Sequence, residues 1–176
     1  MTHWLPGVLS REQLRERILS ELPLISDWSD LEQQLQPNGF DLTVAEVHRH
    51  VGAGTIAISN EMRVLPELQP LAFDQTGYID LEPGAYHIVY NETVSLPNDV
   101  MALARPRSSL NRSGVTIHTA VWDAGYSGRS TSLLSVLNPA GFRVQQGARV
   151  LQLIFVGLAV ASAEGYRGKY QGENIR

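Results

Sequence analysis

Apolar residues near the start of the chain recur at helical spacing. Residues 10–13 (Ser-Arg-Glu-Gln) have the form of a capping box, which marks a helix start. The apolar residues that follow are four apart: Leu14, Ile18 and Leu22. The spacing predicts a helix that ends at Pro23, and a second short helix around residues 27–36 that ends at Pro37-Asn38-Gly39.

From residue 40 onward the pattern changes to short apolar runs separated by turns. Residues 41–48 alternate between apolar and polar side chains, and residues 77–80 and Pro83-Gly84 are predicted turns around a short strand. Further strands are predicted at residues 87–96, 99–104, 115–120, 130–137 and 148–156. Many short strands at this spacing are typical of a sandwich or jelly roll. We therefore expect a mainly β fold, a sandwich or distorted jelly roll, with short N-terminal helices.

The 176 residues are enough for one domain with a substantial core, and neither an internal repeat nor a linker divides them. Within residues 1–176 we distinguish a helical N-terminal lead (1–36), a β body (37–164) and a C-terminal arm (165–176). The arm is polar and rich in glycine. Such a segment is expected to be frayed, or ordered by a ligand.

Charge and composition narrow the possible partners. The net charge of −4 and the pI of about 5.7 do not favour a nucleic acid polymer, so phosphate binding requires a local cluster of cations. The chain has no cysteine, which excludes disulfides and thiolate metal sites. The N-terminus lacks a signal-peptide pattern, and the longest apolar run, residues 150–161, is too short to cross a membrane. We expect a cytoplasmic protein.

Two short segments carry the chemistry. Arg107-Ser108-Ser109 places a guanidinium and two hydroxyl groups on a turn, which suits a polyphosphate, although an isolated segment of this kind is more often a solvated surface turn. Asp123 stands beside Gly125 and Tyr126. A carboxylate in such a place can orient and deprotonate a water molecule, or it can simply stabilise a turn.

The contexts of these segments resemble a known superfamily. The sequences ARPRSSLNRSG (residues 104–114) and HTAVWDAGYSG (residues 118–128) are similar to the second and third motifs of the dUTPase and dCTP deaminase superfamily. Residues 37–42 and 149–154 resemble the first and fourth motifs, and residues 166–172 resemble the C-terminal "Y-x-G-K-Y-Q" of the deaminase branch. The resemblance extends from Pro37 to Gly172 and is strongest to the archaeal-type dUTPases.

This resemblance implies hydrolysis of dUTP to dUMP and pyrophosphate, which limits uracil in DNA and supplies dUMP for thymidylate synthesis. It also implies a distorted jelly roll or β-clip-type barrel, and a homotrimer with active sites shared between subunits. Asp123 would be the catalytic residue, and Tyr126 would pack on the deoxyribose and leave no room for a 2′-hydroxyl. The other implied substrate-binding residues are Arg107, Ser108, Ser109, Arg112, His118, Gln152, Tyr166, Lys169, Tyr170 and Gln171. Magnesium would bind through substrate phosphates and water, with Asp41 and Gln152 around it.

The choice between hydrolysis and deamination depends on one position. In the deaminases a proton-transferring glutamate follows the aspartate by ten residues, and here that position is Leu133. Because ring deamination without a metal needs a proton shuttle, hydrolysis is favoured. A hairpin between Val115 and Tyr126 is predicted, and we expect its backbone groups to recognise uracil. The alternatives are a dCTP deaminase, alone or coupled to hydrolysis, a nucleotide-binding trimer without turnover, and a structural jelly roll.

Overall fold

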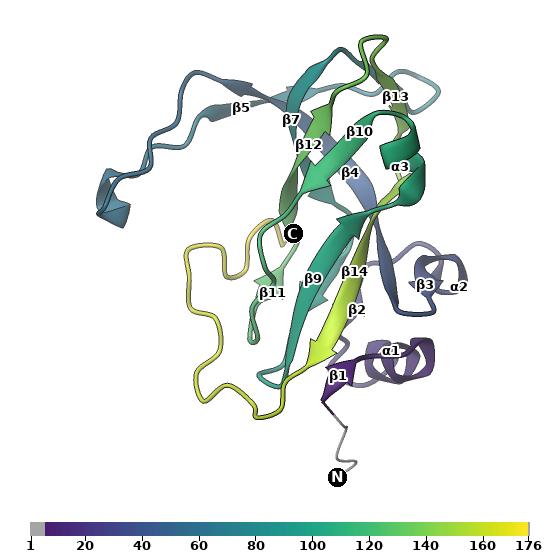
Figure 1. The fold of residues 1–176 in the computed structure, drawn as a ribbon, viewed down its shortest axis with the longest axis vertical. Coiled ribbons are helices and arrows are strands. Elements are labelled where there is room, and N and C mark those ends of the chain that lie inside the picture. The colour runs from purple at the N-terminus through teal and green to yellow at the C-terminus, as the bar shows by residue number, and fades with distance from the viewer. Residues whose placement is uncertain (1–5, 176) are drawn as a thin grey trace.

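Strands dominate residues 6–175, which are the residues that the computed structural model describes (Figure 1). The helices are α1 (Arg11–Ile18), α2 (Leu31–Gln34), the 3-10 helix η1 (Asn60–Met62) and α3 (Ser108–Arg112). The strands are β1 (Gly7–Val8), β2 (Ile25–Ser26), β3 (Leu35–Gln36), β4 (Gly39–Val51), β5 (Glu67–Leu71), β6 (Tyr78–Leu81), β7 (Gly84–Tyr90), β8 (Thr93–Ser95), β9 (Val100–Pro106), β10 (Val115–His118), β11 (Ser127–Gly128), β12 (Thr131–Val136), β13 (Phe142–Gln145) and β14 (Arg149–Gly157). The predicted mainly β fold with short N-terminal helices is confirmed.

The N-terminal helices are shorter than predicted. The capping box of α1 is present, since the Ser10 hydroxyl accepts from the Gln13 backbone N–H and the Gln13 side chain accepts from the Ser10 N–H at 2.9 Å. Helix α1 ends at Ile18, one turn before Pro23. Leu22 is consequently 90% exposed, so its predicted place on the buried face is wrong. The second helix is the single turn α2, and β3 follows it directly.

Strand β4 joins the two halves of the main sheet. Its first half pairs with β14, and from Val44 onward it pairs with β7, with a register shift between Val44 and Glu46. The path through the antiparallel sheet is β1-β14-β4-β7-β12-β10, while β9 pairs with β14 and both β3 and β5 pair with β4. The result is the curled sheet seen in Figure 1. Because both faces of its first half are covered, residues 39–45 are all buried, and the predicted alternation fails there.

The strands predicted in the second half of the chain are confirmed as β7 to β10, β12 and β14. The predicted turn at residues 77–80 is wrong, because Tyr78–Leu81 forms β6 and pairs with β13. Strands β5, β6 and β13 were not predicted. In the part of the chain that the structure describes, none of the helices is long and apolar enough to span a membrane.

A buried polar network fixes α2 to β4. The Glu92 carboxylate, with no solvent exposure, accepts from the Gln34 amide at 2.7 Å, the Thr43 N–H at 2.9 Å and the Thr43 hydroxyl at 2.6 Å. The same Gln34 amide donates to the Asp41 carbonyl at 3.0 Å. Burial raises the pKa of Glu92, whereas these donors lower it. The network therefore determines where Asp41 lies in the core.

A long excursion between β4 and β5 projects from the body of the molecule (Figure 1). We call residues 52–66 the β4–β5 arm. Its apolar side chains face solvent: Ile56 is 80% exposed, Ile58 is fully exposed and Met62 is 68% exposed. An apolar protrusion of this kind is typical of a surface that another chain covers.

Three histidines lie together on one face of the sheet. His48 on β4 pairs with His87 on β7, and the ring of His87 is 6.0 Å from the rings of both His48 and His50. On the other side His87 pairs with Leu133 of β12, and Leu133 pairs with His118 of β10. Burial, and secondarily the neighbouring His48 and His50, lower the pKa of His87 to about 4.

This lowered pKa predicts a loss of stability in acid. Between pH 6.5 and about 4 the unfolded His87 binds a proton that the folded form does not, so the folded state loses about 1–3 kcal/mol as the pH falls through this range. We expect His87→Asn to flatten that part of the pH profile of the unfolding free energy, measured by urea denaturation. An unchanged slope in the variant would contradict this assignment.

Candidate active site

Asp123 is presented by a rigid turn in the loop between β10 and β12. The backbone of Trp122 pairs with Ala102 through hydrogen bonds of 2.9 and 3.1 Å, and the Tyr126 N–H donates to the Asp123 carbonyl at 3.0 Å. Gly125 within the turn has φ of +84°, a conformation that favours glycine. Trp122 and Tyr126 are buried, whereas Asp123 is exposed. The turn thus places a carboxylate in solvent between two anchored aromatic rings.

This carboxylate lines a cavity of about 300 Å³. The lining residues are Ala120, Val121, Trp122, Asp123, Tyr126, Ser130, Thr131, Tyr166, Tyr170 and Glu173. The rings of Tyr126 and Tyr166 meet edge to face with centroids 5.8 Å apart. Six of the ten lining residues are apolar or aromatic. Such a wall with a few polar groups is the usual composition of a small-molecule site.

The C-terminal arm closes one side of this cavity and is docked on the loop of its own chain. The Tyr166 N–H donates to the Ala124 carbonyl and the Gly172 N–H to the Ser127 carbonyl, both at 2.8 Å. The glycines pack against each other, since a Cβ added to Gly125 would lie 2.5 Å from the Gly165 Cα. The described part of the arm, residues 165–175, therefore finds hydrogen-bond partners within its own chain, and ordering by a ligand stays a prediction.

Two of the four predicted residues of the C-terminal arm line the cavity, and the other two do not. Tyr166 and Tyr170 line it. The Gln171 side chain instead bridges two backbone groups of the loop: it donates to the Gly125 carbonyl and accepts from the Ser127 N–H, each at 3.1 Å. Lys169 is exposed on the arm.

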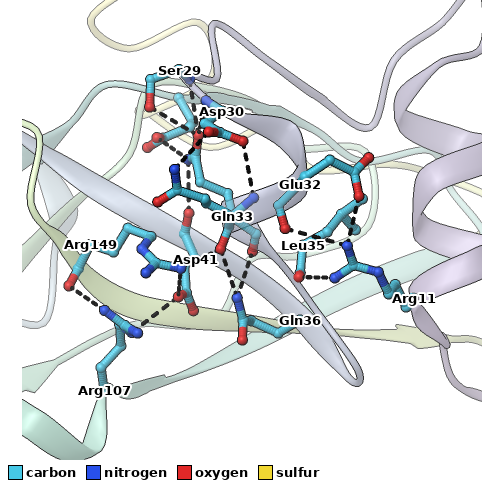
Figure 2. Close-up of polar contacts among 12 residues, drawn as sticks. Arg11, Ser29, Asp30, Glu32, Gln33, Leu35, Gln36, Asp41, Arg107 and Arg149 are labelled. Atoms are coloured by element: carbon cyan, nitrogen blue, oxygen red, sulfur yellow. Dashed lines mark hydrogen bonds and ion pairs between the residues drawn. The ribbon is translucent and has the colours of Figure 1, made fainter.

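Arg107 belongs to a second cluster, shown in Figure 2. Its Nε lies 3.0 Å from the Asp41 Oδ2, and the Nη1 of Arg149 lies 3.5 Å from the same oxygen. Asp41 is only 1% exposed, whereas the two arginine side chains are 31% and 30% exposed. Burial raises the pKa of Asp41, and the arginines lower it. Two guanidinium groups share one carboxylate, so the cluster keeps a net positive charge that is open to solvent.

The other predicted phosphate residues lie beside this cluster. Arg107 directly precedes α3, which places the exposed Ser108, Ser109 and Arg112 on one helical turn. Gln152 on β14 stands opposite Asp41 on β4 in the strand register. The second oxygen of Asp41, Oδ1, is buried and has no hydrogen-bond partner among the described residues.

The Asp123 cavity and the arginine cluster are separate within the described chain. Figure 1 shows α3 at one end of β10 and the loop that leads to β11 at the other. None of the residues described as lining the Asp123 cavity belongs to the arginine cluster. His118 is exposed at the end of β10 and does not line the cavity. The segment expected to recognise the base is not a closed hairpin, because β10 pairs with β12.

Sequence reasoning did not select Glu173 or Arg149 as site residues. Arg149 lies within the fourth motif, so its basic charge beside a polar strand position was a usable signal. Glu173 follows the C-terminal motif and carries no pattern of its own. Only the docking of the arm brings it into the cavity.

The arginine cluster predicts a marked cost for neutralising Asp41. We expect Asp41→Asn to lower the unfolding free energy by about 1–3 kcal/mol, less than for a fully buried pair because both arginines reach solvent. Urea denaturation of the variant measures this. Asp80→Asn is the matched control, since Asp80 is 77% exposed and lies 3.7 Å from Arg143. Equal effects in the two variants would contradict the prediction.

Comparison with known proteins identifies the family. Residues 8–158 match the family described as dCTP deaminase-like. Over 168 residues the chain is 47% identical to the probable deoxyuridine 5′-triphosphate nucleotidohydrolase of Methanosarcina mazei, covering 96% of this chain and 98% of the relative. It is also 47% identical, over 169 residues and the same shares, to the protein of that name from Archaeoglobus fulgidus.

A solved structure agrees with the fold. The crystal structure of 2′-deoxycytidine 5′-triphosphate deaminase from Agrobacterium tumefaciens aligns with a TM-score of 0.66 and 22% identity. The alignment covers 86% of this chain and 48% of that chain, so this chain corresponds to about half of it. The resemblance noted in the sequence is confirmed: the chain belongs to the dCTP deaminase-like family.

Proposed function

We propose that this protein hydrolyses dUTP to dUMP and pyrophosphate, thereby limiting uracil in DNA and supplying dUMP. The observation that carries the proposal is the exposed Asp123 carboxylate, held on a rigid turn beside Tyr126 at a cavity of about 300 Å³. Relatives that match almost the full chain at 44–47% identity are named probable deoxyuridine 5′-triphosphate nucleotidohydrolases, which supports this reaction.

The proposed chemistry needs one base. The Asp123 carboxylate accepts a proton from a water molecule, whose oxygen forms a bond to the α-phosphorus. The bond from the α-phosphorus to the bridging oxygen breaks, and pyrophosphate leaves with its electron pair. Tyr126 packs on the deoxyribose.

The phosphate-binding groups are proposed to come from the arginine cluster and the arm. Arg107, Ser108, Ser109, Arg112 and Lys169 hold the phosphates, while His118, Gln152, Tyr166, Tyr170 and Gln171 complete the nucleotide site. These side chains supply the guanidinium, ammonium and hydroxyl donors that a triphosphate requires.

Magnesium fits this arrangement when it is bound through the substrate. The described residues contain no group of three or more His, Asp or Glu side chains able to hold a metal by themselves. The Asp41 Oδ1 has no hydrogen-bond donor among the described residues, and Gln152 stands opposite Asp41 in the strand register. Both side chains would accept hydrogen bonds from water molecules in the ion's hydration shell. When bound, the ion supplies positive charge that neutralises the leaving pyrophosphate.

Deamination of dCTP is disfavoured by the position of Leu133. Leu133 shares a face of β12 with Thr131, which lines the cavity, and the strand Thr131–Val136 contains no acid. The second carboxyl group at the cavity, that of Glu173, already accepts a hydrogen bond from the Tyr126 hydroxyl. Strand β12 therefore lacks the acidic side chain that ring deamination requires for proton transfer.

We also propose that one domain, residues 1–176, assembles as a homotrimer whose sites combine half-sites of neighbouring chains. Two observations support this: the arginine cluster lies apart from the Asp123 cavity, and the β4–β5 arm exposes apolar side chains. Neither a nucleic acid polymer nor a membrane is a proposed partner, and the proposed location is the cytoplasm.

The first test is the loss of the base. We expect Asp123→Asn to reduce kcat for dUTP by about 10²–10⁴-fold while nucleotide binding persists, because only proton transfer is removed. Pyrophosphate release is measured with dUTP, dCTP, dTTP and UTP, with Asp80→Asn as the control. A variant with a normal rate would place the base elsewhere. Conversion of dCTP to a uracil nucleotide would favour the dCTP deaminase. Tight binding of dUTP without turnover would favour a nucleotide-binding protein that senses and does not hydrolyse.

The second test asks whether the sites are shared. We expect assemblies made only of Arg107→Ala chains, or only of Asp123→Asn chains, to be inactive. In mixed assemblies some interfaces combine the intact arginine cluster of an Asp123→Asn chain with the intact Asp123 of an Arg107→Ala chain. With equal mixing each residue is intact in half of the chains, so we expect about a quarter of the wild-type dUTP turnover. Absence of recovery in purified mixed assemblies would show that each site is built within one chain.

A further inference from the structure

The hydroxyl group of Tyr126 is engaged by the C-terminal arm. It donates to the Oε1 of Glu173 at 2.9 Å, and the tyrosine is 6% exposed. Glu173 lies 47 positions further along the chain and lines the same cavity as Asp123. The tip of the ring at the proposed sugar site is therefore held by a residue outside the loop that carries the ring.

The backbone around Glu173 makes this contact a fixed one. The Arg129 N–H donates to the Glu173 carbonyl at 2.9 Å, and the Gly172 N–H donates to the Ser127 carbonyl at 2.8 Å. The Asn174 amide donates to the Arg129 carbonyl at 3.0 Å. The arm thus packs along the loop as a series of turns, with the Glu173 carboxylate hydrogen-bonded to Tyr126.

Gly128 provides independent evidence that the contact is built into the fold. A Cβ at this position would lie 2.6 Å from the Tyr126 hydroxyl oxygen and 3.3 Å from the Glu173 Cγ. A side chain at residue 128 would therefore displace the ring or the carboxylate. The space that the missing Cβ leaves is occupied by the hydrogen-bonded pair.

Two contacts restrain the ring. The edge-to-face contact with Tyr166 holds its plane, and the hydrogen bond to Glu173 holds its tip. Burial raises the pKa of the Tyr126 hydroxyl and also that of Glu173, and the hydrogen bond from Tyr126 lowers the pKa of Glu173. The hydroxyl thus remains the donor and the carboxylate the acceptor.

We infer that Glu173 is a positioning residue for sugar discrimination, which holds the Tyr126 ring where it excludes a ribonucleotide 2′-hydroxyl. The inference rests on the proposed function, in which Tyr126 packs on the deoxyribose. A ring free to move by a fraction of an ångström makes room for a hydroxyl group. Loss of the carboxylate therefore admits UTP more than it impairs dUTP.

The test compares kcat/KM for dUTP and for UTP in Glu173→Ala and Glu173→Gln. We expect the alanine variant to lower the dUTP/UTP ratio about tenfold, mainly through a lower KM for UTP. The glutamine variant should restore the ratio, because its amide oxygen accepts the same hydrogen bond. Tyr126→Phe should lower the ratio similarly, and adding Glu173→Ala to it should have no further effect.

Glu164→Ala is the matched control, since Glu164 directly precedes the arm and its side chain is 75% exposed. An unchanged ratio in Glu173→Ala, or equal losses for both nucleotides without rescue by glutamine, would overturn the inference and leave Glu173 as a structural contact. Calorimetric binding of dUMP and UMP to the same proteins separates the two proposals. A wild type that binds dUMP selectively without hydrolysing dUTP refutes only the hydrolase. A wild type that binds both equally refutes the positioning role.

Discussion

The buried carboxylate of Asp41 constrains more of this structure than any other single group. It lies on the first half of β4 and is nearly inaccessible to water, so its charge must be compensated within the protein. Arg107, which links β9 to α3, and Arg149, the first residue of β14, supply that compensation. The Arg149 guanidinium also donates to the Gln33 carbonyl of α2 (Figure 2). One charge thereby ties together three segments that are distant in sequence, and Arg149 links them to α2.

The polar network around Glu92 completes this arrangement. The Gln34 amide donates to both the Asp41 carbonyl and the Glu92 carboxylate, so α2 is attached to β4 beside the charged cluster. Helix α3 follows the anchored Arg107 directly. The partly exposed guanidinium groups of Arg107 and Arg149 keep hydrogen-bond donors that face solvent. The proposed phosphate-binding surface, built in this way, would lose little conformational freedom on binding an anion.

Much of the fold follows from local pattern. The capping box at Ser10 and the apolar runs of β7, β9, β12 and β14 are properties of neighbouring residues, and they formed as predicted. The predicted burial of Leu22 was wrong because helix α1 ends at Ile18, and the spacing of apolar residues does not encode that end. Strands β6 and β13 are polar on one side and exist through pairing with each other, so neither segment alone indicates a strand.

The site shows the same division. Asp123 and Tyr126 are three positions apart, and a turn sufficed to bring them to one cavity. Arg149 and Glu173 acquire their positions from partners more than forty residues away, Asp41 and Tyr126 respectively, and no local pattern encodes such a distance. The sequence also could not show that the arm finds its docking surface within its own chain.

That docking has a consequence for affinity. A tail that became ordered only around a nucleotide would spend part of the binding free energy on its own immobilisation. Here the glycine-on-glycine contact between Gly125 and Gly165, and the backbone hydrogen bonds beside it, meet that entropic cost when the polypeptide folds. The chain therefore carries a preorganised wall for the proposed site, and the free energy of recognition would remain available for distinguishing one nucleotide from another.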